Sequence, residues 1–353
     1  MTTQTFRIGP ATVGYGHPVF IIAEAGVNHN GRLDLALKLI DAAADAGADA
    51  VKFQTFHAED VVTSQGEMAA YQKKNIGKVK SQIEMLRELE LKDKDYPLLI
   101  ARAKKRKILF LSTPHGGKNS VDFLRKLGIP AFKFGSGDLT NLPVIAYAAS
   151  FGKPMILGTG MGTMKEVEDA IAVIQKAGNR KIAMLHCTSN YPCPPEETNL
   201  RAMTTMMENL PVLVGYSDHT AGIQIPIMVT AMGACVIEKH FTLDKNMAGP
   251  DHKASLEPDE LRSMVEAVRL ATTVLGSSKK APNPSEKIIA PLVRKSLVTL
   301  KPIDKGEKFT HNNIGIKRPG TGIQPREYSR ILGKTARRMI PADTLLRPHD
   351  IRP

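Results

Sequence analysis

Eight short apolar runs recur along the first 240 residues of the chain, and each of them ends in polar side chains. They are FIIAE (20–24), AVKFQ (50–54), ILFLST (108–113), AFKFGS (131–136), PMILGTG (154–160), IAMLHCTSN (182–190), VLVGYSDHT (212–220) and ACVIEKH (234–240). Segments with the apolar spacing of helices lie between them. Strands that alternate with helices predict a parallel α/β fold, and eight such units predict a closed (β/α)8 TIM barrel. The polar residues that end the strands would then meet at one mouth, where barrel enzymes hold their active sites.

Apolar spacing also predicts where the longer helices lie. One helix is expected over 33–46, and another over 258–275 closes the barrel. Over 84–107 the spacing predicts helices interrupted at Pro97, because proline breaks a helix interior. The polar segment 58–82 is longer than an ordinary loop after a strand, so we interpret it as an insertion over the barrel mouth and a candidate lid.

The composition changes after the last of these helices. The stretch GSSKKAPNPSEK, rich in Gly, Ser, Lys and Pro, begins at Gly276 and predicts a linker over 277–294. Beyond it, short β-like runs alternate with turns. We therefore expect a catalytic barrel domain over 1–276 and a small β-rich domain over 295–353 that buries little surface on its own.

The chain carries a net charge of +13, and much of the positive charge lies near its C-terminal end. Residues 279–353 contain 17 Lys and Arg against 6 Asp and Glu. Such asymmetry can indicate nucleic-acid binding, but this segment has no series of aromatic residues for base stacking and no basic helix stripe. We expect anionic small molecules as partners, and no nucleic acid.

The sequence also has the features of a cytoplasmic protein. No stretch approaches the ~18 apolar residues of a membrane helix, and the start MTTQTFRIGP lacks the basic and apolar parts of a signal peptide. The three cysteines, Cys187, Cys193 and Cys235, are odd in number and have no CxxC spacing for a metal, so no disulfide framework is expected. We expect a cytoplasmic enzyme without a membrane partner.

His219 and His240 form the strongest candidate metal site. Each ends one of two consecutive strands, and neighbouring strands lie ~4.8 Å apart, so both imidazoles can reach one cation. Two nitrogen ligands leave positions open for water and substrate oxygens, which suits a Lewis acid that polarises a carbonyl. A single histidine near a strand end is more often a hydrogen-bonded structural residue, and it is the pair that favours a metal.

Lys52 and Lys133 lie in the apolar runs of the second and fourth strands. Because desolvating a lysine is costly unless it meets an anion, two lysines at one mouth predict a site for a phosphate or carboxylate. Further hydrogen-bond donors lie at the same level: Ser112, Thr113, Ser136, Ser189, Asn190 and Ser217. Any one of these residues taken alone is more simply a turn residue.

Three carboxylates are candidates for proton transfer or for binding hydroxyl groups. Glu24 ends the first strand, Asp138 follows the fourth, and Asp251 lies in GPDHKAS after the eighth. A helix N-cap is the alternative role for Asp138, because a helix is predicted to begin at Leu139.

Together these motifs resemble the bacterial sialic acid synthases. The resemblance is carried by AEAGVNHNG, AVKFQTF, STP, KFGSGDLTN, TGMGT, HCTSNYP, GYSDHT, VIEKHFTLDKNMAGPDHKASLEP and IKRPGTGI, and it covers nearly the whole chain. It implies a barrel joined to a small antifreeze-like domain of the SAF fold, in a domain-swapped homodimer in which each tail domain covers the partner's active site. It also implies condensation of phosphoenolpyruvate with N-acetylmannosamine to give N-acetylneuraminate, a nine-carbon 2-keto acid, and phosphate.

The resemblance implies roles for individual residues as well. His219 and His240 would bind Mn²⁺ or another divalent ion such as Mg²⁺ or Co²⁺. Phosphoenolpyruvate would be surrounded by Lys52, Thr113, Lys133, Ser136, Ser189 and Ser217. The open-chain amino sugar would be held by Glu24, Gln54, Tyr191 and Asp251, with Arg318 of the partner chain's tail at its N-acetyl group. As a mechanistic hypothesis of our own, we take Asp138 as the candidate carboxylate that would help to take a proton from the water that adds to the enol carbon.

Three positions depart from the family pattern. Gly158 stands where the family often has serine, which removes one expected phosphate donor. Asp138 stands where many relatives carry Glu, and its shorter reach could require an intervening water. Ser189 stands where some members have Asn.

Two other functions stay open as alternatives. Legionaminic acid synthase runs the same reaction on 2,4-diacetamido-2,4,6-trideoxymannose, and the run KNMAGPDHKASLEP is similar in both groups. Pseudaminic acid synthase is disfavoured, because GPDHKAS does not resemble the loop of that branch. A non-catalytic binding module would instead use the basic tail to bind DNA in a salt-dependent manner. The two lysines and two histidines at the mouth argue against such a silent barrel.

Overall fold

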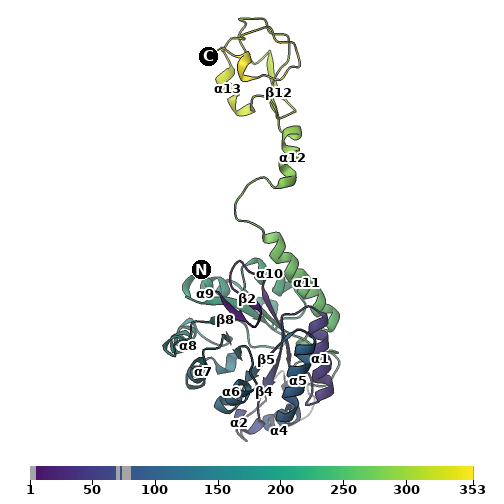
Figure 1. The fold of residues 1–353 in the computed structure, drawn as a ribbon, viewed down its shortest axis with the longest axis vertical. Coiled ribbons are helices and arrows are strands. Elements are labelled where there is room, and N and C mark those ends of the chain that lie inside the picture. The colour runs from purple at the N-terminus through teal and green to yellow at the C-terminus, as the bar shows by residue number, and fades with distance from the viewer. Residues whose placement is uncertain (1–4, 69–71, 74–80, 353) are drawn as a thin grey trace. The chain divides into compact units, whose positions relative to one another are not determined.

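The structure is a computed structural model that describes residues 5–68, 72–73 and 81–352. The chain forms two compact units, residues 1–276 and residues 277–353 (Figure 1). Within the described residues, no helix combines the length and the apolar character that crossing a membrane requires.

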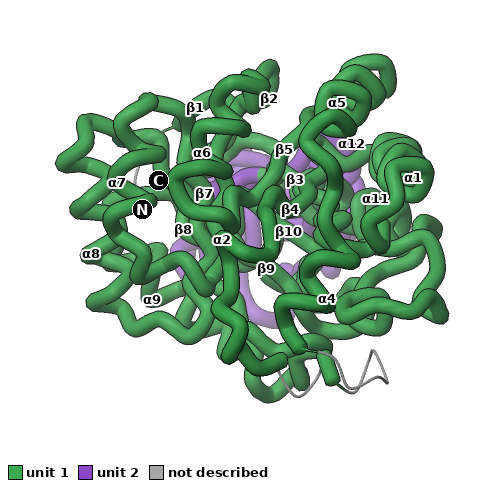
Figure 2. The backbone as a smooth tube through the Cα atoms, turned by 90° about the horizontal axis from the view of Figure 1, so that it is seen from below, with its two compact units in different colours: residues 1–276 green, residues 277–353 purple. Residues whose placement is uncertain are grey.

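The first unit is built on eight parallel strands. They are β3 (Phe20–Gly26), β4 (Ala50–Thr55), β5 (Leu109–Pro114), β6 (Phe132–Phe134), β7 (Met155–Gly158), β8 (Ile182–His186), β9 (Leu213–Asp218) and β10 (Val236–His240). Their hydrogen-bonded order is β5-β4-β3-β10-β9-β8-β7-β6, and the two end strands, β5 and β6, pack beside each other. The sheet therefore forms a near-barrel of the predicted (β/α)8 class, with its helices outside (Figure 2).

The helices follow the strands in the predicted alternation. They are α1 (Leu33–Asp45), α2 (Ala58–Val61), α4 (Gln82–Leu89), α5 (Tyr96–Lys105), α6 (Gly117–Lys126), α7 (Leu142–Ala149), α8 (Met164–Lys176), α9 (Arg201–Asn209), α10 (Gln224–Ala231) and α11 (Pro258–Leu275). The helices predicted over 33–46 and 258–275 are confirmed by α1 and α11. Pro97 lies in the first turn of α5, where its missing N–H costs nothing, so the break falls before it rather than at it.

The hydrophobic residues divide between two faces of the sheet, because alternate residues of a strand point to opposite sides. Outward residues such as Ile21 and Val51 pack with the helices in the main core. Inward residues near the strand starts, such as Phe20, form a second cluster. The hairpin of β1 (Phe6–Ile8) and β2 (Ala11–Val13) packs on that cluster. The inward positions near the carboxyl ends of the strands are left for polar side chains.

A buried ion pair on the outward face joins the last two strands. Lys239 Nζ lies 2.5 Å from Asp218 Oδ2, and neither side chain is exposed. Lys239 directly precedes His240, and Asp218 directly precedes His219. The pair therefore fixes β10 against β9 beside both candidate metal ligands.

The segment 58–82, predicted as an insertion and candidate lid, lies partly outside the described residues. Its described part begins with α2, whose first backbone N–H, at Ala58, donates to the Glu90 carboxylate at 2.5 Å. Met68 is buried in a small separate cluster with Met85 and Leu89 of α4. This part of the segment is thus attached to α4, and its role as a lid stays a prediction.

The second unit contains more helix than its composition suggests. Helix α12 (Pro284–Val293) lies within the segment expected as a linker, and it begins at Asn283 with a capping box that satisfies its first N–H groups. Strand β11 (Ser296–Thr299) pairs antiparallel with β12 (Ile314–Lys317), and α13 (Tyr328–Ile331) follows. The unit has a small core of its own: Leu297, Ile303, Phe309, Ile314, Ile331, Ala336, Ile340 and Leu346.

Two buried histidines lie in the loops that follow β3 and β10, and His252 connects the two loops. His252 contacts Asn30 Oδ1 through Nε2 at 3.2 Å and Thr242 Oγ1 through Nδ1 at 2.6 Å. His29 packs beside the ring of Phe53, with 5.9 Å between the ring centroids. Burial lowers the pKa of each histidine to about 4.

These pKa values predict an acid-sensitive fold. An unfolded histidine binds its proton near pH 6.5, whereas the buried rings bind theirs near pH 4, so the unfolded state gains protons first as the pH falls. The stability that the neutral rings contribute above pH 6.5 is lost on the way down to about pH 4. For His29 alone the loss is expected to be about 3 kcal/mol. Denaturant unfolding measured at several pH values tests this, and a His29→Asn variant should show a shallower pH slope than the wild type; equal slopes would contradict it.

Candidate active site

Eleven of the predicted site residues line one cavity at the carboxyl ends of the barrel strands. The cavity has a volume of about 210 Å³. The eleven are Glu24, Lys52, Gln54, Thr113, Lys133, Ser136, Ser189, Tyr191, Ser217, His219 and His240. Five further lining residues were not among the predicted site residues: His115, Gly135, Gly137, Met161 and Glu238. The polar ends of the strands therefore converge as the alternating pattern indicated.

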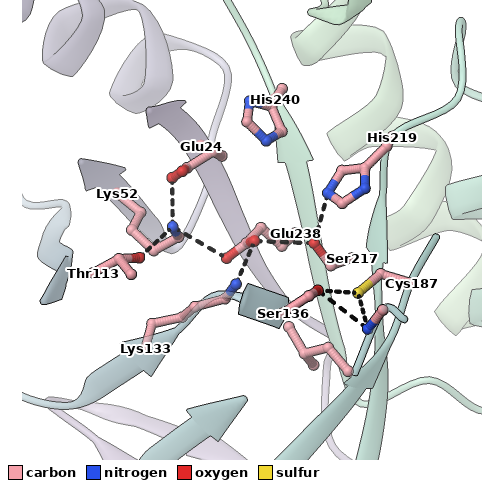
Figure 3. A network of polar contacts seen from close by, with 12 residues as sticks. Glu24, Lys52, Thr113, Lys133, Ser136, Cys187, Ser217, His219, Glu238 and His240 are labelled. Atoms are coloured by element: carbon pink, nitrogen blue, oxygen red, sulfur yellow. Dashed lines mark hydrogen bonds and ion pairs between the residues drawn. The ribbon is translucent and has the colours of Figure 1, made fainter. Parts of the chain in front are cut away.

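The two lysines are held by two buried carboxylates, as Figure 3 shows. Lys52 Nζ lies 2.8 Å from Glu24 Oε2 and donates to Thr113 Oγ1 at 2.9 Å. Lys133 Nζ lies 3.0 Å from Glu238 Oε1, and Lys52 Nζ lies 3.7 Å from the other oxygen of the same carboxylate. Glu238 thus joins the two lysines into one charge cluster.

Sequence reasoning missed Glu238, although a signal was present. Glu238 lies two positions before His240 in β10, so the two side chains point to the same face of the strand. Burying an unpaired carboxylate in a strand costs free energy, as burying an unpaired lysine does. Glu238 could therefore have been expected to have a positively charged partner.

The electrostatics of the cluster hold Glu238 ionised. Burial alone would raise the pKa of Glu238, but the charges of Lys133 and Lys52 outweigh burial and lower the pKa to about 2. Burial would lower the pKa of Lys133, but the nearby carboxylates of Glu238 and Glu24 raise it. Glu24 differs, because its burial raises its pKa despite the opposing charge of Lys52. Glu24 is accordingly the carboxyl group of this cluster that takes up a proton more readily.

The two histidines lie close together beside this cluster, with 5.5 Å between their ring centroids. His219 Nδ1 lies 2.6 Å from the Thr188 carbonyl oxygen, so Nδ1–H donates there and Nε2 carries the lone pair. Nε2 lies 3.2 Å from the Tyr191 hydroxyl and 3.4 Å from the Ser217 hydroxyl. Burial lowers the pKa of His219 to about 4, and burial together with His219 lowers the pKa of His240 well below its usual range.

These properties fit a divalent cation. Both rings are neutral near pH 7, which is the form that binds metals. The buried Nδ1 atom of His240 has no hydrogen-bond partner among the described residues. Within the same part of the chain no three His, Cys, Asp or Glu side chains gather in a metal-binding arrangement, so the protein would offer two nitrogen ligands and leave the other positions to water or substrate.

A left-handed backbone conformation explains one glycine of the site. Gly26 has a φ of +53° and follows an irregularity in the pairing of β3 with β4. A Cβ on Gly26 would lie 3.4 Å from Glu24 Oε1 and 3.6 Å from His240 Cε1. Glycine is therefore required for the left-handed backbone, whereas a Cβ would meet the surrounding groups at ordinary van der Waals distances.

A set of small polar groups lies near Lys133. The Gly160 N–H donates to Ser136 Oγ at 3.1 Å and to Cys187 Sγ at 3.2 Å, and these two side chains lie 3.1 Å apart. A Cβ at Gly158 would lie 3.1 Å from Ser136 Oγ. The Ser136 hydroxyl therefore occupies the space that a serine side chain at position 158 would need.

The chain matches models of two known families. The NeuB family model matches residues 39–280, and the SAF domain model matches residues 294–352. The N,N'-diacetyllegionaminic acid synthase of Campylobacter jejuni is 49% identical over 93% of this chain and 98% of its own length. The corresponding synthase of Legionella pneumophila is 45% identical over 93% of each. The chain belongs to the NeuB family.

A solved structure of the same family agrees with the fold. The N-acetylneuraminic acid (sialic acid) synthetase of Leptospira borgpetersenii is 35% identical and superposes with a TM-score of 0.72 over 81% of this chain and 94% of that one. The resemblance seen in the sequence is confirmed, and so is the barrel with a C-terminal SAF domain. The protein is an enzyme of the NeuB family.

Of the residues to which the family resemblance gave a role in this NeuB-family enzyme, three lie outside the cavity lining. Asp251 is close by, with Oδ2 4.0 Å from His240 Nδ1, and burial together with the Glu24 charge raises its pKa to about 7. Asp138 is half-buried, and it does not cap α7, whose N-cap residue is Asn141. Arg318 is exposed in the second unit, so the first unit contains all the other predicted residues.

A second, larger cavity adjoins the first. It measures about 730 Å³ and lies between the residues that follow β7 and β8. Met161 and Ser189 line both cavities, whereas the charge cluster and the two histidines line the smaller one alone. The buried charge cluster and the histidine pair therefore make the smaller cavity the candidate active site.

Proposed function

We propose that this NeuB-family enzyme condenses phosphoenolpyruvate with the open-chain aldehyde of an N-acetylated amino sugar, giving a nine-carbon 2-keto acid and phosphate. The observation that carries the proposal is one cavity in which two buried lysines lie beside two neutral histidines. The lysines offer positive charge to an anionic substrate, and the histidines offer nitrogen ligands to a cation. An enol phosphate held next to a polarised aldehyde is the arrangement that this condensation needs.

We place 2,4-diacetamido-2,4,6-trideoxymannose first as the sugar, and N-acetylmannosamine second. The sequence alone favoured N-acetylmannosamine. The two legionaminic acid synthases, at 49% and 45% identity over 93% of this chain, support the reverse order. The reaction is the same for both sugars, so the order bears on substrate preference and not on the chemistry.

On the anion side, Lys52 and Lys133 would bind the phosphate and carboxylate of phosphoenolpyruvate. The hydroxyls of Thr113, Ser136, Ser189 and Ser217, which all line the cavity, would donate to the same oxygens. Because Glu238 stays ionised between the lysines, it fixes their positions before the substrate arrives. Such preorganised charge is worth most in a site closed to water.

On the cation side, His219 and His240 would hold Mn²⁺, or Mg²⁺ or Co²⁺ in its place. A bound divalent cation supplies Lewis acidity toward a carbonyl oxygen. Glu24, Gln54 and Tyr191 would hold the hydroxyls of the open-chain sugar. Asp251 lies outside the cavity lining, with Oδ2 4.0 Å from His240 Nδ1, and would act on the sugar side only through His240.

The bond changes follow from the substrates. The enol carbon C3 of phosphoenolpyruvate forms the new bond to the aldehyde carbon, and positive charge develops at C2. Water adds at C2, and the resulting tetrahedral carbon becomes the ketone as its bond to the phosphate oxygen breaks. Phosphate therefore leaves by carbon–oxygen cleavage.

Parallel phosphate-release assays with phosphoenolpyruvate, Mn²⁺ and each of the two sugars test the proposal. The diacetamido sugar is expected to give the higher kcat/KM. In heavy-oxygen water the label should enter the keto acid and not the phosphate. A higher kcat/KM with N-acetylmannosamine would reverse the order of substrates, and the absence of phosphate release with both sugars would contradict the proposed reaction.

We also propose a homodimer in which the second unit of one chain completes the active site of its partner. Helix α12 carries four exposed apolar side chains, Ile288, Ile289, Leu292 and Val293, of which Ile288 is 75% exposed. A second copy of the chain would cover this surface and would bring Arg318 to the N-acetyl group of the sugar. The basic character of the tail suits a domain that closes over an anionic substrate.

An Arg318→Ala variant is expected to raise the KM for the sugar about tenfold, with little change in the KM for phosphoenolpyruvate, because a charged hydrogen bond of about 1.5 kcal/mol would be lost on the sugar side alone. Steady-state kinetics with each substrate varied in turn measures both values. Equal increases would contradict a contact to the sugar.

Mixed dimers test the exchange of tails. Chains with Arg318→Ala and chains with Lys133→Ala are each deficient, but a mixed dimer would contain one active site with both native residues. Recovery of part of the activity after refolding the two chains together is expected. No recovery in a mixture shown to contain heterodimers would count against the swapped arrangement.

A further inference from the structure

His115 is a lining residue of the cavity that has no role so far. It directly follows β5, and its backbone N–H donates to the Thr55 carbonyl at 3.0 Å, which extends the pairing of β5 with β4. Its side chain is 28% exposed. In the circular strand order β5 lies opposite β9, so His115 enters the mouth from the wall that faces His219.

The imidazole of His115 lies against the turn that carries the anion-side residues. A Cβ built on Gly135 would lie 3.3 Å from His115 Cε1 and 3.9 Å from Nε2. The absence of a side chain at Gly135 thus leaves the Nε2 edge of the ring beside the turn between Lys133 and Ser136. That edge is on the phosphoenolpyruvate side of the cavity.

Asp138 contacts the other edge of the same ring. Asp138 Oδ2 lies 3.4 Å from His115 Nδ1, and Asn141 Nδ2 donates to Asp138 Oδ1 at 3.3 Å. Asp138 does not line the cavity, whereas His115 does. A chain Asn141–Asp138–His115 therefore leads from α7 to the substrate space, and Asp138 can act on a substrate only through the histidine.

The other titratable side chains that line the cavity are already engaged. Glu24 and Glu238 are bound to the lysines, and Tyr191 contacts His219. With a pKa of about 2, Glu238 is a weak base. His115 contacts a carboxylate and no lysine, which is the setting of a histidine that transfers protons.

We propose that His115, oriented by Asp138, transfers the proton of the water that adds to C2 of phosphoenolpyruvate to the phosphate that departs. This inference rests on the proposed condensation and assigns the proton path within it. His115 is the residue in contact with the reacting groups, and Asp138 is a positioning residue.

The proton balance closes within the site. As the water oxygen bonds to C2, the lone pair of His115 Nε2 takes one of the water's protons. As the bond from C2 to the phosphate oxygen breaks, the electron pair of that bond goes to the oxygen, and His115 returns the proton to it. The second proton of the water leaves as the C2 hydroxyl becomes the ketone, and it balances the aldehyde oxygen that becomes a hydroxyl.

The test compares wild type, His115→Gln, Asp138→Asn and the double variant, each with Mn²⁺ and the better sugar. His115→Gln is expected to lower kcat about 100-fold, while the KM for phosphoenolpyruvate stays within about threefold, because a lost proton transfer costs rate and not binding. Asp138→Asn is expected to lower kcat about tenfold in wild type and not at all in the His115→Gln background. In a His115→Ala variant, added imidazole should restore part of kcat.

The outcomes separate the two proposals. Wild type that releases no phosphate would overturn the proposed function, and with it this inference. Wild type that turns over while His115→Gln keeps its kcat would overturn the inference alone. An Asp138→Asn effect of equal size in both backgrounds would show that Asp138 acts independently of His115 and would overturn the proposed chain. Thermal unfolding of each variant identifies any loss that arises from misfolding, and imidazole rescue decides the case in which His115→Gln folds poorly.

Discussion

A His240→Ala variant is expected to lose phosphate release by about 1000-fold or more, because removing one of two protein ligands to a Lewis acid forfeits several kcal/mol of charge stabilisation. His240 carries a buried Nδ1 with no partner among the described residues, and its lowered pKa keeps the ring neutral. The remaining ligand, His219, cannot hold the cation alone at ordinary concentrations. Added Mn²⁺ is therefore not expected to restore the rate.

Two measurements make this prediction specific. The affinity for Mn²⁺, followed by its paramagnetic effect on water relaxation, should fall in His240→Ala without any substrate present. A matched variant, His311→Ala, replaces an exposed histidine of the second unit and should keep both the affinity and the rate. Near-normal turnover by His240→Ala would mean that the metal assignment is wrong.

Much of the fold and site could be predicted because both follow from the order of residues within single strands. The alternation of eight apolar runs with helical segments predicts the barrel. The residue that ends a run lies at the mouth whatever the rest of the chain does, since the carboxyl ends of parallel strands share one edge. Lys52, His219 and His240 were found in this way, and the structure brings all three to one cavity.

The missed features depend on contacts between different elements. His115 gains its place only because Gly135 leaves room for the ring and Asp138 meets its Nδ1 from another strand's loop. Spacing within either segment carries no signal of that contact. Helix α12 was likewise hidden, because its Lys- and Pro-rich approach is typical of a linker while the capping box at Asn283 starts a helix.

The sequence also did not reveal which groups neutralise the two buried lysines. The two inward lysines predicted a site for a substrate anion, which stays a prediction, and the protein's own carboxylates beside them were not predicted as their partners. Glu238 and Glu24 hold the lysines in the absence of substrate. The partner of a buried cation can come from any strand that packs around it. It therefore depends on the closed barrel and not on neighbours in the sequence.

Replacing Lys133 with methionine should therefore affect both activity and stability. Activity is expected to fall by about 100- to 1000-fold, as when one preorganised charge is removed from a phosphate-binding site. The free energy of unfolding is expected to fall by about 3–5 kcal/mol, because Glu238 would remain buried with Lys52, at 3.7 Å, as its one remaining lysine partner in the described part of the chain. Phosphate-release kinetics and denaturant unfolding measure the two losses separately.

A second substitution distinguishes the two roles of the lysine. In the double variant Lys133→Met/Glu238→Gln the uncompensated carboxylate is gone, so most of the lost stability should return. Activity should not return, because the positive charge for phosphoenolpyruvate is still missing. If the double variant recovered activity, Lys133 would serve only to neutralise Glu238. If the single variant unfolded at the wild-type denaturant midpoint, the pair would contribute nothing to the fold, and the cluster would have to be maintained for binding alone.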